Sequence, residues 1–222
     1  MSEWWTYRPE DFLLFSPRVY WRMFELQNEV AWPWQLAMLA LGMALVVAMA
    51  LRPAQFDMWI GLTLAVLWAF VGWTFVWGRY APINWAMVYL APAFGLQAAL
   101  LVLAAIRGWL AGGLSPPHRA GLAMVASGVV IYPLLPLLFD RSLSTSEVFG
   151  MAPDPTAIAT LGLALASRRR TALLLMPIPT LWLVISGLTL HTMGDTQAFA
   201  TALAVAAALA ILILRWFDRR TG

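Results

Sequence analysis

Cysteine is absent from the 222 residues, and so is lysine. Without cysteine the chain has no disulfides, thiolate nucleophiles, iron–sulfur clusters or cysteine-based zinc sites. Without lysine, every one of its 14 basic residues is an arginine. Thiol chemistry therefore tells nothing about the compartment in which the protein works.

Charged residues are also scarce. They make up 11% of the chain, against 62% hydrophobic residues and a mean hydropathy of +0.75. Soluble domains carry about 25% charged residues, so a water-soluble fold of this composition would have too few polar groups to cover its apolar surface. The net charge is +3, but the arginines lie singly or in short clusters between apolar runs, which is typical of membrane proteins. We expect a lipid bilayer as partner and no nucleic acid.

The residues that most enzymes use are missing too. The two histidines, His118 and His191, are expected at opposite faces of the membrane, which excludes a bis-histidine haem and a histidine-rich zinc site. No G-x-S-x-G, Walker or G-x-G-x-x-G motif occurs. We predict no catalytic residues, no metal and no cofactor. The opening residues, MSEWWTYRPEDF, do not have the pattern of a secretory signal peptide.

Seven apolar segments approach the length that crosses a bilayer, about 20 helical residues. They end at arginine, proline, glycine or aspartate and comprise residues 34–51, 58–77, 84–106, 118–139, 155–167, 171–191 and 196–217. The pattern predicts an all-α polytopic transmembrane helix bundle of about seven spans, covering residues 34–222. In a six-span alternative, residues 155–167 are a re-entrant segment.

Residues 1–33 form an N-terminal segment of mixed composition. Ser16 and Pro17 suit the N-cap and the first position of a helix. The residues that follow separate onto two faces at helical spacing. The mainly apolar face has Val19, Tyr20, Met23, Phe24, Gln27, Val30 and Ala31, and the charged face has Arg18, Arg22, Glu25 and Glu29. We expect an amphipathic interfacial helix, lying either on the lipid or against the protein's own bundle.

The distribution of arginine predicts the orientation. With seven spans and the C-terminus in the cytoplasm, the inner segments contain Arg52, Arg107, Arg119, Arg168, Arg169, Arg170, Arg215, Arg219 and Arg220. The outer segments contain the smaller set Arg8, Arg18, Arg22, Arg79 and Arg141. We therefore expect the N-terminus outside and the C-terminus inside; six spans would break this pattern.

The fifth segment has an acid at its mouth. Residues 155–167 are too short for a hydrocarbon core of roughly 30 Å, and Pro153 and Pro155 argue against regular helix around Asp154. Asp154 is therefore expected just below the outer surface, at a helix N-terminus. Its carboxylate caps free backbone amides there, or it binds a cation, a proton or a substrate amine.

Further polar groups are expected on the same outer side. We predict that Asp154, Asn84, His191, Tyr132 and Arg79, with Gln97 deeper, line an outward-facing vestibule formed by broken helices. The alternative is that the ends of loops are simply polar and line nothing.

Three segments together resemble a bacterial multi-pass membrane family known only as a domain of unknown function. They are DFLLFSPRVYWRMFELQN (residues 11–28), RYAPINWAMVYLAPAFGLQA (79–98) and PDPTAIATLGLALA (153–166). The resemblance implies a bacterial cytoplasmic (inner) membrane and supplies no reaction. The family pattern often has cysteine between the two prolines, where this chain has Asp154. A soft-metal role that such a cysteine would imply is therefore in doubt here.

Two functions follow from these features. The first is a small transporter or channel for a neutral or weakly polar solute, because helix breaks are frequent and deep charges are few. The second is a non-catalytic accessory or scaffold subunit of a larger membrane complex, with partner subunits or self-association. A membrane enzyme acting on lipids ranks last, because no acid, base or metal ligands converge.

Overall fold

The computed structural model of the protein describes residues 13–51, 56–110 and 116–217. Its regular structure in these ranges is all helical, as predicted. The α-helices are α1 (Pro17–Ala31), α2 (Trp34–Leu51), α3 (Phe56–Val71), α4 (Met87–Ile106), α5 (Pro116–Ala126), α6 (Pro153–Ala166), α7 (Arg169–Leu175), α8 (Pro177–Thr192) and α9 (Ala198–Phe217). Between them lie the π-helices η3 (Gly72–Tyr80) and η4 (Ser127–Ile131) and the 3-10 helices η5 (Tyr132–Leu138) and η6 (Leu143–Thr145).

Five stretches of the described chain are long and apolar enough to cross a membrane. They are residues 34–51, 56–80, 87–106, 118–138 and 198–215, and a sixth forms if α7 and α8, which meet at a 45° bend, count as one span. These six coincide with six of the seven predicted segments. The remaining one is α6, which at 14 residues corresponds to only about 21 Å of helix. The structure is thus compatible with a multi-pass membrane protein, and a seventh span is not confirmed.

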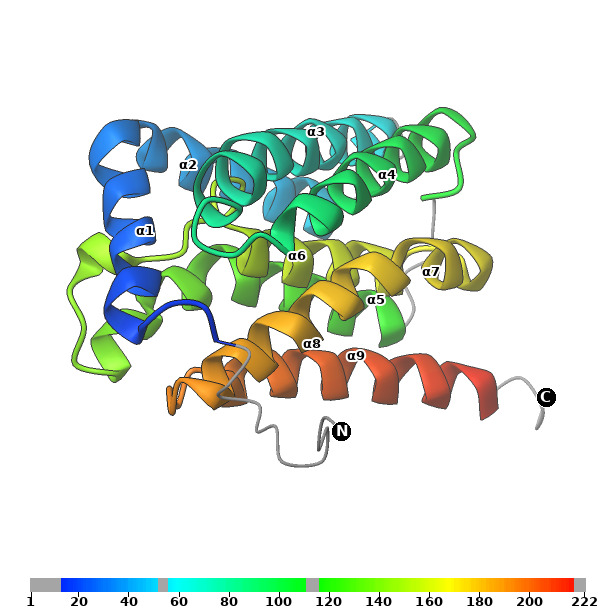
Figure 1. Ribbon diagram of the computed structural model, residues 1–222. Helices are drawn as coiled ribbons and strands as arrows, with labels where there is room; N and C mark the ends of the chain where they lie inside the picture. Colours follow the sequence, from blue (N-terminus) through cyan, green and yellow to red (C-terminus); the bar gives the residue numbers. More distant parts are fainter. Residues whose placement is uncertain (1–12, 52–55, 111–115, 218–222) are drawn as a thin grey trace.

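Helix α6 runs through the middle of the bundle. Figure 1 shows α3 and α4 on one side of it and α8 and α9 on the other, and α6 also packs against α5 and α7. All 14 residues of α6 are buried. Because other helices surround it, α6 does not have to match the thickness of the bilayer. This explains how so short a helix can lie in the core of the bundle.

Helix α1 lies across one end of the bundle, roughly perpendicular to the long helices (Figure 1). We call this end, where α6 begins, the α1 end, and the opposite end, where α6 meets α7, the α7 end. The N-cap of α1 is Ser16, as predicted, and its hydroxyl accepts from the Val19 amide at 3.4 Å. Tyr20, Met23 and Phe24 of the predicted apolar face are buried, so this face packs against the bundle, one of the two alternatives. Val19 and Val30, assigned to the same face, are 43% and 75% exposed.

The start of α6 differs from the prediction. The helix begins at Pro153, so Asp154 lies inside its first turn rather than in irregular backbone before it. The physical reason is that the first amides of a helix have no intrahelical acceptor, so a proline there loses no hydrogen bond. Pro153 and Pro155 therefore begin this helix instead of breaking it.

Candidate functional site

Asp154 is the centre of a buried polar cluster. Its side chain is 1% exposed. Oδ1 accepts from the indole Nε1 of Trp182 at 2.7 Å, and Oδ2 accepts from the hydroxyls of Tyr132 at 2.8 Å and Ser186 at 2.6 Å. Every hydrogen bond that the described residues donate to this carboxylate comes from a side chain, so the expected capping of backbone amides is wrong. All three donors are uncharged, and each belongs to a helix other than α6.

Tyr132 reaches Asp154 from the point where one span changes its helical form. The π-helix η4 ends at Ile131, and the Tyr132 amide donates to the carbonyl of Ser127, five residues back. The 3-10 helix η5 follows, with Pro133 and Pro136 in it. Because proline has no amide hydrogen, the α-helical ladder does not continue through this stretch. The change of pitch sets the direction of the Tyr132 side chain.

Trp182 and Ser186 reach Asp154 from α8. They lie four residues apart, which places both side chains on the same face of the helix. The 45° bend between α7 and α8 aims this face at α6. The bend has a sequence cause, since Pro179 has no amide to give to the carbonyl of Leu175.

Gln97 of α4 supplies the missing donor at that bend. Its Nε2 donates to the Leu175 carbonyl at 3.1 Å, and the side chain is fully buried. A backbone carbonyl freed inside a membrane bundle needs such a partner. Gln97 was predicted to lie deeper in a vestibule, and that role stays a prediction; in the structure its amide donates to the broken backbone.

The cluster continues from Asp154 toward the loop that precedes α6. Nε2 of Gln197 donates to Oε1 of Glu147 at 2.7 Å and lies 3.4 Å from the Tyr132 hydroxyl. The guanidinium of Arg141 donates to Oε1 of Gln197 and pairs with Asp195 at 2.5 Å. One connected set of polar side chains therefore joins Asp154 to the partly buried ion pair of Arg141 and Asp195.

Trp21 attaches α1 to the outer part of this network. Its indole Nε1 donates to Oδ2 of Asp195 at 3.1 Å. The Arg141 guanidinium lies 3.6 Å from the centre of the Trp21 ring, a cation–π distance. Helix α1 thus covers the polar cluster and contacts its ion pair directly.

Glu147 is the second buried acid of the cluster. It is 2% exposed, and its Oε2 has no hydrogen-bond partner among the described residues. Burial raises the pKa of the Glu147 carboxyl well above its ordinary value, and the neighbouring charge of Asp154 raises it further. Because two carboxyl groups lie in one buried cluster, the protonated form of Glu147 is favoured over the ionised form.

An apolar groove reaches the cluster from the side of the bundle. It has a volume of about 500 Å³ and lies between the span of α5, η4 and η5 and helix α9. Its lining includes Ala123, Ser127, Tyr132, Leu135, Ala204 and Ala207. Tyr132 forms part of this lining and also donates to Asp154. One side chain therefore connects this apolar groove with the buried carboxylate.

The structure brings together two of the five predicted site residues, Asp154 and Tyr132. Arg79 is half-buried and donates to Oε1 of Gln27 on α1. Asn84 is half-buried and accepts from the Ala86 amide at 3.2 Å. His191 is exposed at the end of α8. These three contribute no hydrogen bond to Asp154 in the described structure, and their role in a vestibule stays a prediction.

Sequence reasoning missed four members of the cluster. Two of them carried a signal: Trp182 and Ser186 are spaced i, i+4 in an otherwise apolar segment that follows two prolines. Glu147 is, besides Asp154, the one acid between residues 142 and 194. Gln197 directly follows the loop between two predicted spans, where a polar residue is ordinary and does not indicate a buried site.

Within the described ranges no group of three or more histidine, cysteine, aspartate or glutamate side chains is placed to hold a metal ion. Comparison with curated proteins finds no match, and comparison with solved structures finds none either. A family model does match, over residues 17–222. The match agrees with the resemblance to an uncharacterised family, whereas the bacterial origin stays a prediction. The chain belongs to DUF6064, a family of unknown function.

Proposed function

We propose that this protein is a small membrane transporter for an uncharged or weakly polar amphiphile, with Asp154 as its polar centre. The observation that carries the proposal is the double contact of Tyr132. Tyr132 lines the apolar groove of about 500 Å³, and its hydroxyl donates to Asp154. A molecule with an apolar tail and a hydroxyl or amine head has a place for both parts here.

The chemistry of the cluster favours a neutral ligand over a strongly hydrated ion. Asp154 is surrounded by Tyr132, Trp182 and Ser186, which are uncharged donors. A ligand hydroxyl can exchange with any of them at little cost, because one neutral donor replaces another. An inorganic cation would have to leave its water for a site with few oxygen ligands.

We further propose that the chain lies in the bacterial inner membrane with the α1 end outside and the C-terminus in the cytoplasm. Counting α6 as a protein-enclosed crossing gives seven crossings, an odd number, which places the chain ends on opposite sides. The arginine excess at the α7 end supports this orientation. In it, α1 lies in the outer interface, and Glu147 faces the outer side.

A vesicle assay tests the transport proposal. The probe is an uncharged, short-chain fluorescent glycolipid, whose hydroxyls suit Asp154 and whose tail suits the groove. Proteoliposomes are treated with a membrane-impermeant reductant, which quenches only the fluorophores that reach the outer leaflet. The wild-type chain should quench the inner pool faster than protein-free vesicles do.

Three variants sharpen the assay. Asp154→Asn and Ala204→Phe, which fills the groove, should both return the rate to that of protein-free vesicles. Ala202→Phe adds the same ring on an exposed position of α9 outside the groove and should keep the wild-type rate. Wild-type activity at background, or full activity in Asp154→Asn, would overturn the proposal.

The second candidate is an accessory subunit, and one surface favours it. The exposed rings of Trp73 and Trp77 stack with their centres 6.5 Å apart beside a hollow of about 260 Å³. Gly72 and Gly95 line this hollow, and small residues let another transmembrane helix approach closely. Purification in a mild detergent tests it, since an accessory subunit should carry a stoichiometric partner that Gly95→Leu releases.

A further inference from the structure

The α7 end of the bundle has a basic pocket that the transport site does not use. Its volume is about 580 Å³, and it is lined by Trp109, Arg168, Arg169, Arg170, Thr171 and Leu174. Three consecutive arginines thus share one pocket with an aromatic ring. None of the six lining residues is acidic.

Fixed contacts between two helices shape this pocket. The Thr171 hydroxyl donates to the Trp109 carbonyl at 2.9 Å and so ties the start of α7 to the residues after α4. Gly108 has a φ of +62°, which turns the chain there and which side chains other than glycine rarely tolerate. The Arg107 guanidinium lies 5.8 Å from the Trp109 ring. Trp109 is therefore held in place opposite the arginines.

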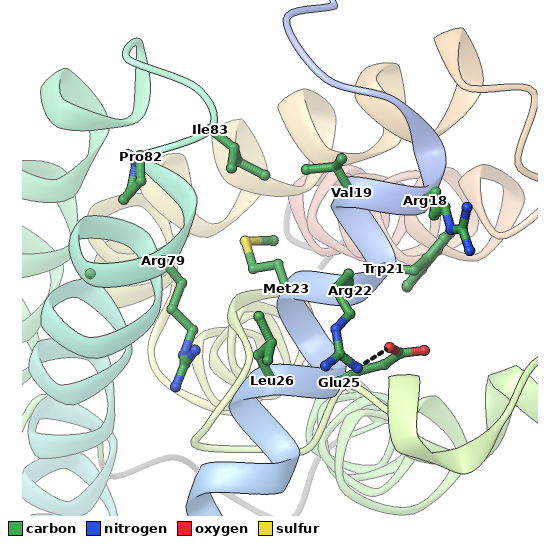
Figure 2. A pocket seen from close by; sticks show the side chains of 11 residues that line it. Arg18, Val19, Trp21, Arg22, Met23, Glu25, Leu26, Arg79, Pro82 and Ile83 are labelled. Carbon is green, nitrogen blue, oxygen red and sulfur yellow. Dashed lines mark hydrogen bonds and ion pairs between the residues drawn. The ribbon is translucent and has the colours of Figure 1, made fainter.

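A second basic pocket, at the α1 end, provides a comparison. In Figure 2, Val19, Met23 and Leu26 of α1 face the other wall of this groove, where Arg79 and its neighbours lie. Its volume is about 840 Å³.

The charges of that α1-end groove are largely balanced within the protein. Arg22 pairs with Glu25 at 2.8 Å and with Glu29 at 3.1 Å, and Figure 2 shows the first of these contacts. Arg79 donates to Gln27. Of these two pockets, the one at the α7 end combines several arginines with described lining residues none of which is acidic.

We propose that the α7-end pocket binds the phosphate of an anionic phospholipid. The pocket lies where α4 ends and α7 begins, at the rim of the apolar part of the bundle. Exposed apolar side chains lead away from it, since Ile106 is 61% and Leu173 is 49% exposed. Arginines hold the phosphate diester, and these apolar side chains contact the acyl chains. A free phosphate would use only the first of these contacts.

The test uses the purified full-length chain in nanodiscs of phosphatidylcholine, into which phosphatidylglycerol is titrated. Native mass spectrometry counts the lipids that remain bound. Two double variants each remove two arginines and the same charge. Arg168→Gln with Arg170→Gln changes the proposed site and leaves Arg169 in place. Arg18→Gln with Arg22→Gln changes the α1-end groove and serves as the matched control.

The wild-type chain should retain phosphatidylglycerol in preference to phosphatidylcholine. The α7-end double variant should bind it on the order of thirtyfold more weakly, given about 1 kcal/mol for each basic residue near an anionic headgroup. The control double variant should stay within about twofold of wild type, because exposed ion pairs contribute little. Arg168→Lys with Arg170→Lys should restore most of the binding, which separates loss of charge from loss of fold.

Equal loss of binding in both double variants would show attraction by net charge alone and would overturn the proposal. Equal retention of the two lipids by the wild-type chain would overturn it too. Inorganic phosphate forms the third arm. If phosphate at the same concentration displaces phosphatidylglycerol, the pocket takes a free anion, and the assignment to a lipid is wrong.

Discussion

The first turn of α6 accepts side-chain hydrogen bonds at a buried carboxylate, whereas its last turns accept them at backbone carbonyls and pack closely on α5. At the α1 end, Asp154 accepts from Tyr132, Trp182 and Ser186 on two other spans. Near the last turn the Arg215 guanidinium donates to the Leu165 carbonyl at 2.8 Å. At the α7 end, Gly162 and Gly121 of α5 allow the two helices to touch. A Cβ built on Gly162 would lie 2.5 Å from the Gly121 carbonyl oxygen, closer than real contacts allow.

The first turn also has a close backbone contact, since a Cβ built on Gly128 would lie 2.8 Å from the Pro155 carbonyl oxygen. The two ends therefore differ in the hydrogen bonds that the Asp154 carboxylate accepts. Hydrogen bonds between neutral donors and a carboxylate can be exchanged for equivalent bonds to a ligand. Backbone packing has no equivalent exchange, because a close-packed contact is lost as soon as the helices separate. In the proposed transport function, a ligand would therefore exchange with the hydrogen bonds of Asp154 while the glycine contact between α5 and α6 stays in place.

The largest effect should come from the glycine contact. Gly162→Leu places a branched side chain against the Gly121 carbonyl and the Val125 amide, so it should cost more than the roughly 3 kcal/mol of ordinary overpacking. Unfolding by denaturant in detergent micelles measures the loss. Gly95→Ala is the matched control, because its Cβ would meet no atom within 4 Å. It should stay within about 1 kcal/mol of wild type, and equal losses in both variants would contradict the steric account.

The next effect should come from the polar end. Asp154→Ala leaves three buried donors without their acceptor, at roughly 1 kcal/mol or more each, so we expect a loss of about 3 kcal/mol in the same unfolding assay. Asp154→Asn keeps one oxygen acceptor and should lose less than half as much. If alanine and asparagine are equally harmful, the negative charge rather than the hydrogen bonding stabilises this end.

Hydropathy was sufficient to predict the long spans. The predicted segment 34–51 has the bounds of α2, and segments 84–106 and 196–217 each lie within three residues of α4 and α9. These segments are apolar all round, so their existence depends on composition and length rather than on their neighbours. The existence of the short helix α6 can also be predicted from composition. Its burial cannot, because the burial depends on the five helices that surround α6.

The partners of Asp154 could not be predicted for a physical reason. Which side chains reach it depends on two departures from regular helix, the change of pitch at Tyr132 and the bend at Met176. The prolines indicate that each segment is irregular, but they do not give the direction of the bend. Arg79, Asn84 and His191 are polar residues at the same end, and polarity alone did not distinguish them from Trp182 and Ser186.

A pH series distinguishes the two ends of α6, because the α1 end has the buried acid Glu147 and the α7 end has no buried acid in the described structure. The raised folded-state pKa of Glu147 means that the folded protein holds a proton that the unfolded chain, with a pKa of about 4.3, releases more readily. This contribution to stability is fully present below the unfolded pKa and is lost as pH rises toward the folded pKa. The melting temperature should therefore fall as pH rises above about 4.3.

Glu147→Gln replaces the titratable carboxyl group with an amide. The fall in melting temperature that Glu147 causes above about pH 4.3 should therefore disappear. The substitution keeps an oxygen that accepts from Gln197, so the variant should melt a few degrees higher than wild type at pH 8. At pH 4 the two proteins should melt at similar temperatures. A difference between them that does not change with pH would show that Glu147 is ionised throughout.

The smallest effect should come from the contact between α1 and the polar end. Trp21→Phe removes the donor to Asp195 and keeps an aromatic ring beneath Arg141. Since the Arg141–Asp195 pair stays intact, we expect a loss of about 1 kcal/mol or less. Trp21→Ala also removes the cation–π contact and should lose at least twice as much by the same denaturant titration. If Trp21→Phe and Trp21→Ala lose the same free energy of unfolding, the hydrogen bond from the indole, and not the cation–π contact, holds α1 in place.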